Sequence, residues 1–156
     1  MIRRAVPAMP RMAQSGVGLI EVLIAVLVLS IAFLGIAALQ AVSLSTNNSA
    51  MARSMATVAS YSILDAMRAD IVSAKNGSYN KTVTANACSS TVTTLADVQL
   101  AQWCNQLGRS LGAAAATKGT VSCTGAGVCT VTIAFDDSRA GAGGSSNQTV
   151  TTKAML

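Results

Sequence analysis

Four cysteines are the residues of this sequence best placed to do chemistry, and they are Cys88, Cys104, Cys123 and Cys129. An even number of cysteines, all following a long apolar run, favours disulfide bonds formed in an oxidising compartment. A zinc site does not fit, because the sequence has no Cys-x-x-Cys pair and no histidine. We therefore expect disulfides and no bound metal.

The absence of histidine also removes the common catalytic arrangements. Without histidine there is no Ser/His/Asp triad and no Cys/His pair. Asp136 and Asp137 are adjacent at the end of an expected strand, and we interpret them as a solvated turn rather than an acid/base pair or a calcium site. The glycine-rich stretch 141–144 lacks the following Lys-Ser/Thr of a phosphate loop. The sequence predicts neither an enzyme nor a cofactor.

Glu21 is the only charged residue between Arg11 and Arg53. It lies inside residues 17–42, where the other polar side chains are Ser30 and Gln40. About 20 apolar residues are enough to cross a membrane as a helix, and the apolar core of a cleaved secretory signal has only about 7–15. We therefore expect residues 17–42 to form a membrane-spanning helix that carries one carboxylate.

Two interpretations of Glu21 follow. A charge at the centre of a membrane helix costs about 2.5–3.5 kcal/mol, and less near the headgroups. Glu21 then either lies at headgroup level or awaits a cationic partner once the helix leaves the lipid. Gly16, just before the run, is a candidate cleavage site, and a cut there would leave Glu21 as the fifth residue behind a free amine at Val17.

Charge outside the apolar run sets the orientation. Arg3, Arg4 and Arg11 precede the run and should stay in the cytoplasm under the positive-inside rule, which leaves the cysteines on the other side. These three arginines supply +3 of the formal net charge of +5. The rest of the chain therefore carries 8 basic and 6 acidic residues, a net charge of +2. No basic cluster is interleaved with aromatic residues, so the sequence does not favour nucleic acid as a partner without excluding it.

The helix should continue out of the membrane over residues 43–75, which contain neither Pro nor Gly, and should end at a left-handed cap at Asn76-Gly77. Two apolar stripes lie on nearly opposite faces of it: Met51, Met55 and Val58 on one, and Leu64, Met67 and Ile71 on the other. Either the first stripe packs against neighbouring helices and the second against the chain's own domain, or both are ordinary core stripes.

Residues 76–156 should form a small α+β head. Thr94 and Asp97 predict the start of a helix that places Trp103 in the core and ends near Gly112, and residues 78–95 should be a loop with one short strand. Residues 119–137 read as a β-hairpin, residues 138–146 as a flexible loop and residues 148–155 as a further strand. One face of the hairpin is apolar: Val121, Cys123, Cys129, Val131, Ile133 and Phe135.

The strand alternation in the hairpin indicates which cysteines pair. Cys123 and Cys129 lie on the same face on either side of the turn, which makes their pairing natural and leaves Cys88 for Cys104. Four cysteines allow three connectivities, so this pairing is a prediction.

The segment SGVGLIEVLIAVLVLSIAFLGIAALQ, residues 15–40, resembles the class III leader and N-terminal helix of type IV pilins and pseudopilins. Gly16 matches the glycine before the cut, and Leu19-Ile20-Glu21 match the core motif. The resemblance implies cleavage between Gly16 and Val17 by a prepilin peptidase and methylation of the Val17 amine. The sequence departs from the pattern at Val17, where phenylalanine is usual, and at Gly18, where threonine is usual.

A finer resemblance is to the PilV-type minor pilins. It rests on Leu34-Gly35, Ala38-Leu39-Gln40 and the stretch Asp65-Ala66-Met67-Arg68-Ala69. It implies a type IV pilin-like α+β fold, in which a long N-terminal helix packs on a small antiparallel sheet with an extra helix. The domains would be a leader (1–16), a membrane-spanning and filament-core helix (17–42), its periplasmic continuation (43–75) and a globular head (76–156).

The implied function is a minor pilin that helps to initiate type IV pilus assembly and lies at or near the tip, where Glu21 would compensate the Val17 amine of a neighbouring subunit. The implied partners are the prepilin peptidase, other minor pilins, the major pilin, the inner-membrane assembly machinery and the membrane before assembly. The protein would cross the inner membrane once, with its C-terminal domain in the periplasm, and become extracellular in the pilus. Two alternatives stay open: a minor pseudopilin of a type II secretion system, and an uncleaved single-span anchored binding protein.

Overall fold

The computed structural model describes residues 16–156, apart from the side chains of residues 142 and 143. The chain divides into two compact units, one ending at Leu39 and the other running from Gln40 to Leu156. The first helix, α1 (Leu19–Ala69), supplies residues to both. Each unit is described on its own.

The described part of the first unit is helical from Leu19 onward and has no core. Its large apolar side chains are exposed, from 49% for Val22 to 88% for Leu19. Among the described residues, α1 is the helix long and apolar enough to cross a membrane. A helix that is apolar all round is stable only where lipid or other helices cover it.

The second unit is built on a four-stranded antiparallel sheet. Its strands are β1 (Thr82–Thr84), β2 (Lys118–Cys123), β3 (Val128–Phe135) and β4 (Gln148–Met155). Their order in the sheet is β1-β2-β3-β4, so each strand pairs with its neighbour in sequence. Together with the long N-terminal helix and the extra helix α3 (Leu95–Leu111), the sheet confirms the predicted type IV pilin-like α+β fold.

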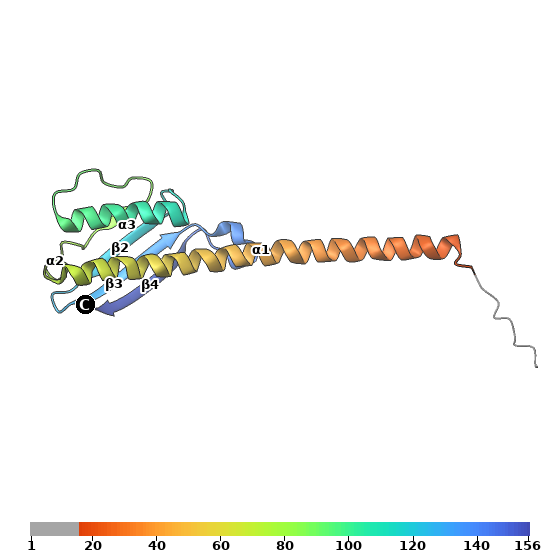
Figure 1. Cartoon of the computed structure of the whole chain (residues 1–156), viewed down its shortest axis with the longest axis horizontal. Coiled ribbons are helices and arrows are strands. Elements are labelled where there is room, and N and C mark those ends of the chain that lie inside the picture. Colours follow the sequence, from red (N-terminus) through yellow and green to blue (C-terminus); the bar gives the residue numbers. More distant parts are fainter. Residues whose placement is uncertain (1–15) are drawn as a thin grey trace, which may run out of the picture. The chain divides into compact units, whose positions relative to one another are not determined.

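Two helices cover one face of this sheet. The expected inward residues of β2 and β3 are all buried: Val121, Cys123, Cys129, Val131, Ile133 and Phe135. Figure 1 shows α3 alongside the C-terminal part of α1, with β2, β3 and β4 running obliquely to both. Trp103 of α3 is 2% exposed and its indole Nε1 donates a hydrogen bond of 2.9 Å to the Ala59 carbonyl of α1, so the prediction of Trp103 in the core is confirmed.

The two predicted stripes of the helix have different environments. Leu64 and Met67 are fully buried in the core of the second unit, whereas Met51, Met55 and Val58 are between 38% and 58% exposed. The second stripe ends early, because Ile71 is 37% exposed and lies beyond the end of α1. One stripe therefore packs on the chain's own domain, and the other is free within the described structure.

The other face of the sheet is rich in threonine. Thr82, Thr120, Thr132 and Thr151 stand opposite one another, one on each strand. The hydroxyls of Thr82 and Thr120 are 3.0 Å apart, within hydrogen-bond distance. The sheet thus presents hydroxyl groups where no helix covers it.

The long helix ends six residues earlier than the sequence predicts. It stops at Ala69, Asp70 takes φ −129° and ψ 56°, and a short helix α2 (Ile71–Lys75) follows. Asp competes with the helix for backbone hydrogen bonds, and its carboxylate here accepts a 3.2 Å bond from the buried Tyr79 hydroxyl. The β-branched residues Ile71 and Val72 further lower the helix propensity just after it.

The predicted cap at Asn76-Gly77 is confirmed at the end of α2. Gly77 has φ +81°, its N–H bonds the Ala74 carbonyl at 3.1 Å, and the Ser78 N–H bonds the Ser73 carbonyl at 3.0 Å. These two bonds form a Schellman motif, which needs a left-handed residue that glycine adopts without strain.

The remaining predictions at this level concern α3 and the segment before β4. Thr94 and Asp97 form a reciprocal capping box, and α3 ends before Gly112, as predicted. Residues 138–146 are expected as a flexible loop, and within them Ser138–Gly143 form 3-10 turns that are interrupted at Gly141, where φ is 62° and ψ is −130°. The hydroxyl of Ser45 on α1 donates to the Arg139 carbonyl of this segment at 3.0 Å, which gives it a fixed place.

Candidate functional site

The predicted cleavage site lies in the exposed backbone just before α1. Residues 16–18 are not helical, and α1 begins at Leu19. Val17 is 71% exposed, and a side chain added at Gly16 would meet nothing within 4 Å. The peptide bond between Gly16 and Val17 therefore lies in exposed, non-helical backbone.

Glu21 lies in the first turn of α1, where its own N–H donates to the Gly18 carbonyl at 3.0 Å. The first turn carries the positive end of the helix dipole, which favours a carboxylate. A free ammonium at Val17 would lie at the same end, where positive charge is unfavourable. Glu21 therefore lies at the end of the helix where a chain cut before Val17 would carry its amine.

Of the expected leader, residues 1–16, all but Gly16 lie outside the described residues. The arginines that predict the orientation of the chain belong to it.

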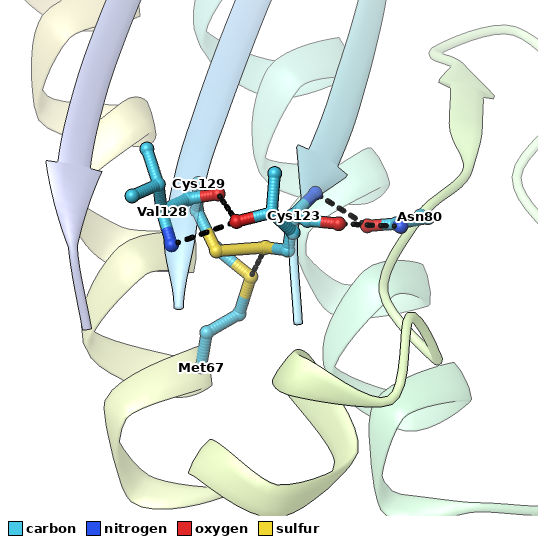
Figure 2. The surroundings of a disulfide bond; sticks show 6 residues. Met67, Asn80, Cys123, Val128 and Cys129 are labelled. Carbon is cyan, nitrogen blue, oxygen red and sulfur yellow. Dashed lines mark hydrogen bonds between the residues drawn. A yellow bond between two sulfur atoms is a disulfide. The ribbon is translucent and has the colours of Figure 1, made fainter. Parts of the chain in front are cut away.

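The two disulfides of the structure follow the pairing predicted from the hairpin. Cys123 pairs with Cys129 between β2 and β3, where the two residues are direct partners in the ladder. Figure 2 shows the bridge lying over Met67 of α1, whose Sδ is 3.6 Å from Cys123 Sγ. The bridge is part of the core rather than an exposed redox centre, since Cys129 is fully buried.

Asn80 completes the end of β2 beside this bridge. Its side-chain amide donates to the Cys123 carbonyl at 3.0 Å and accepts from the Cys123 N–H at 2.6 Å, as drawn in Figure 2. One side chain thereby supplies both bonds that a neighbouring strand would otherwise make. Nothing in the spacing of the sequence indicated this role.

The second disulfide joins Cys88 to Cys104, sixteen residues apart. It ties the loop that follows β1 to the buried side of α3, because Cys104 is fully buried. This bridge therefore holds a loop against a helix, whereas the first holds two strands together.

The expectation of a solvated turn is wrong for Asp137. Asp136 does lie in an exposed turn, where it accepts a 2.9 Å bond from the Ser138 N–H, which lowers the pKa of Asp136. Asp137, in contrast, is 8% exposed and its carboxylate accepts a hydrogen bond from the Ser49 hydroxyl of α1. A buried carboxylate needs such partners, so Asp137 joins the segment before β4 to the long helix.

A metal-binding cluster is absent from residues 16–156, where no three His, Cys, Asp or Glu side chains come together. Sequence reasoning also missed a cavity next to β1, because its walls come from a strand, a loop and a helix that are separate in the chain.

The comparison with family models gives one match. Residues 11–37 match the family model described as the prokaryotic N-terminal methylation motif, which marks type IV pilins and pseudopilins. No curated protein and no solved structure matches the chain. The matched segment contains Gly16, Val17 and Glu21, and the folded part that follows has a type IV pilin-like architecture. Motif and architecture together support a type IV pilin-like or pseudopilin-like protein.

Proposed function

We propose that the protein is a PilV-type minor pilin that contributes to the initiation of type IV pilus assembly and lies at or near the pilus tip. The observation that carries the proposal is the methylation motif over residues 11–37, which includes the glycine, the new N-terminus and the glutamate that assembly needs. The finer assignment is supported by the resemblance of residues 34–40 and Asp65–Ala69 to PilV-type sequences.

The first step is processing by a prepilin peptidase. The enzyme cuts the exposed bond between Gly16 and Val17 and the new amine of Val17 is methylated. The chain then starts two residues before α1, with Glu21 in the first helical turn.

The second step is the transfer of the helix from lipid to a bundle of helices. Both environments cover the exposed apolar side chains of the first unit, so transfer exchanges one apolar surrounding for another. On the second unit, the exposed stripe of Met51, Met55 and Val58 offers further apolar surface to the helices of neighbouring subunits.

The role of Glu21 is to set the register of this bundle. In an apolar interior an unpaired carboxylate is expensive, and the amine of a neighbour's Val17 is the cation that the mature subunits can supply. Only the stagger that brings the two charges together avoids the cost of burying them unpaired.

The place of the protein follows from the same mechanism. The arginines of residues 1–15 stay in the cytoplasm, the apolar helix crosses the inner membrane, and the cysteine-bearing domain lies in the oxidising periplasm. Assembly then carries the subunit into the extracellular pilus. Other minor pilins, the major pilin and the inner-membrane assembly machinery are its partners.

The decisive experiment is the mass and N-terminal sequence of the protein from a host that has a prepilin peptidase. We expect a chain that begins with methylated Val17. A chain that still begins at Met1 or Ile2 would leave an anchored binding protein and exclude a pilin-like role.

A second experiment tests the charge of Glu21. Glu21→Gln should be processed and inserted in the membrane like the wild type but should be lost from sheared pili, because it cannot offset the neighbour's amine. Ser30→Ala, at another polar position of the same apolar run, is the control and should assemble normally. Equal amounts of the Gln variant and the wild type in pili would contradict the proposed role of Glu21.

A minor pseudopilin of a type II secretion system is the second candidate, because the methylation motif is common to both systems. Deletion of the gene separates the two. Loss of surface pili with normal protein secretion supports the pilus, whereas loss of secretion with normal pili supports the pseudopilin.

A further inference from the structure

The sheet of the second unit has two edges, and they differ in length. The edge strand β1 has three residues, whereas the edge strand β4 has eight. Within residues 16–156, β4 pairs along its whole length with β3 and with no other strand. Figure 1 shows β4, in dark blue, as the outermost strand of the sheet. Because short edge strands offer little to pair with, β4 is the edge to which a further strand can be added.

The register of the sheet determines which backbone groups of β4 face outward. The Leu156 N–H bonds the Gly127 carbonyl at 2.9 Å, directly beyond the paired residues Val128 and Met155. In an antiparallel ladder the residues that bond the neighbouring strand alternate, so the even-numbered residues of β4 bond β3. The N–H and C=O groups that point away from the sheet therefore belong to the odd-numbered residues: Thr149, Thr151, Lys153 and Met155.

These outward groups have no partner in the described part of the chain. Outside the ladder with β3, no hydrogen bond of residues 16–156 involves the backbone of residues 149–155. The strand contains no proline, and its register with β3 has no bulge. Prolines and bulges are devices that keep an edge strand from pairing, so the edge of β4 is open to a partner strand.

The core beside β4 is only partly closed. The inward side chains of β4 are half-buried: Gln148, Val150, Thr152 and Ala154. In contrast, Val131 and Ile133 of the neighbouring strand β3 are fully buried. A strand added next to β4 would cover Val150 and Ala154 with its own inward side chains. The partner strand that fits therefore has apolar residues at every second position.

The charged groups along this edge are mainly cationic. Lys153 is exposed in the middle of β4 and has no ion pair within residues 16–156. At the start of β4 the Arg53 guanidinium lies 3.4 Å from Gln148 Oε1, and near its end Lys75 lies against the turn between β2 and β3. The two carboxylates before β4, at residues 136–137, already accept hydrogen bonds from a backbone N–H and from a serine hydroxyl. The edge therefore favours an acidic partner strand.

A second copy of the chain fits this edge less well. Because the outward groups of both β4 strands would lie on odd-numbered residues, their longest antiparallel overlap is centred on Thr152. The two Lys153 side chains would then be diagonal neighbours on one face, about 7–8 Å apart. Like charges at such positions disfavour pairing, and a lysine on an edge strand hinders self-association. An acidic side chain opposite Lys153 has the reverse effect.

We propose that β4 is a docking site for an extended segment of another protein, which adds to the sheet as a further antiparallel strand. Its backbone bonds the outward groups of β4, its apolar side chains lie beside Val150 and Ala154, and an acidic side chain lies opposite Lys153. Pairing of this kind takes its affinity from the backbone and its specificity from alternate side chains. It does not depend on the proposed role in pilus assembly, because β4 belongs to the second unit.

The probe is the peptide acetyl-Thr-Ile-Glu-Val-Thr-Ile-Thr-amide, added to the ¹⁵N-labelled full chain in phosphocholine micelles. In the antiparallel pairing its glutamate lies opposite Lys153, and its isoleucines lie opposite Ala154 and Val150. N-methylation of the two isoleucines and the valine blocks the other edge of the peptide, so that it cannot form fibrils. The control peptide has lysine in place of glutamate.

The readout is NMR titration combined with amide hydrogen exchange. We expect saturable binding of the glutamate peptide with a Kd of about 1 mM or tighter. The odd-numbered amides from 149 to 155 should gain protection, whereas the even-numbered amides are already protected by β3. The lysine peptide should bind about threefold more weakly or less, because repulsion from Lys153 replaces attraction.

Two variants of Thr151 separate backbone pairing from side-chain effects. Thr151→Pro removes one outward N–H, whereas Thr151→Ala keeps it. A proline is compatible with an edge strand where the missing N–H faces away from the ladder, so the variant should fold. We expect proline to weaken binding about tenfold or more and alanine to leave it unchanged. Lys153→Glu gives a test without proline, because it should make the lysine peptide the tighter ligand.

Saturable binding with alternating protection, weakened by Thr151→Pro and reversed in preference by Lys153→Glu, supports the site. No saturable binding of the glutamate peptide, protection that maps to β1, or an unchanged preference in Lys153→Glu would overturn it. Protection of the odd-numbered amides that rises with protein concentration in the absence of peptide would also overturn it, because the occupant would then be a second copy of the chain.

Discussion

Gly119 shows how a single residue sets the packing of the second unit. A Cβ added there would clash with the Trp103 ring and would lie 2.7 Å from Leu107 Cδ1. The sheet and α3 therefore pack so closely at this position that only a glycine fits between them. Trp103 cannot retreat, because its indole is bonded to the Ala59 carbonyl. The absence of a side chain at position 119 is therefore a requirement of the core.

Gly119→Ala should lower the free energy of unfolding by about 1–3 kcal/mol, the usual cost of overpacking a core. Urea unfolding followed by tryptophan fluorescence measures this directly. Gly125→Ala is the matched control, because a Cβ there meets nothing within 4 Å and the backbone is not in the left-handed region, and it should be neutral. Equal stabilities of the two variants would contradict the described packing of Trp103 on β2.

Tyr79 links stability to alkaline pH. Burial and the adjacent carboxylate of Asp70 raise the pKa of Tyr79 to about 12 from an ordinary value of 10.0. Between these values the folded state holds a proton that the unfolded state releases, so folding is less favourable as pH rises. The stabilisation of the neutral phenol is complete below pH 10 and is lost as the pH approaches 12.

Tyr79→Phe should therefore flatten the fall in stability between pH 10 and 12. It should also cost about 0.5–1.5 kcal/mol at neutral pH, because the Tyr79 hydroxyl has hydrogen-bond acceptors in both Asp70 and Gln99. Chemical unfolding at a series of pH values gives both quantities. Tyr61→Phe, at a side chain that is 52% exposed, should leave the stability at neutral pH unchanged. A Tyr79 variant that loses stability above pH 10 as steeply as the wild type would show that this phenol is not the group that titrates.

At the scale of elements, the two disulfides constrain the chain to different degrees. Cys88 and Cys104 are 16 residues apart in sequence, whereas Cys123 and Cys129 are 6 apart and already adjacent in the hairpin. The entropy that a cross-link removes from the unfolded chain increases with the length of the loop that it closes.

Cys88→Ala/Cys104→Ala should consequently cost about 3 kcal/mol and Cys123→Ala/Cys129→Ala about 2 kcal/mol. Thermal unfolding of the two double variants under identical conditions makes the comparison. Amide exchange should additionally show that residues 85–94 lose protection only in the first variant. A larger loss of stability in the hairpin variant would mean that loop entropy is not the dominant effect.

The sequence predicts elements well where a local rule decides them. Thr94 and Asp97 predict the start of α3 because a capping box involves only neighbouring residues, and the alternation of Val121, Cys123 and Cys129 predicts the buried face of the hairpin. Prediction fails where a residue distant in sequence determines where an element ends or whether a side chain is buried. The end of α1 at Ala69 depends on Tyr79, and the burial of Asp137 depends on Ser49, which is 88 residues away.

The candidate site divides in the same way. Gly16, Val17 and Glu21 form a contiguous pattern that can be recognised in the sequence, and residues 11–37 match the corresponding family model. The cavity beside β1 could not be predicted, because Thr84, Thr91 and Leu100 come together only through the fold and the Cys88–Cys104 bridge.

At the scale of the whole molecule, the second unit has a core of its own. The residues of that core, with those packed against it, run from Ala52 to Leu156, and none comes from the first unit. The first unit should therefore be dispensable for the folding of the second.

A chain that begins at Gln40 should be soluble and should unfold in one cooperative transition, with both disulfides formed. Near-ultraviolet circular dichroism during heating and a count of free thiols check these expectations. If the truncated chain has no near-ultraviolet signal, the core of the second unit needs the first unit after all.

The order of the strands also has a kinetic consequence. Because β1, β2, β3 and β4 pair only with their neighbours in sequence, the sheet forms without a crossover between distant strands. These pairings close shorter loops than the packing of α1 on the sheet, where Met67 and Cys123 are 56 residues apart. Both disulfides likewise close short loops. A chain that emerges N-terminus first can thus add β2, β3 and β4 in turn, each beside the strand before it.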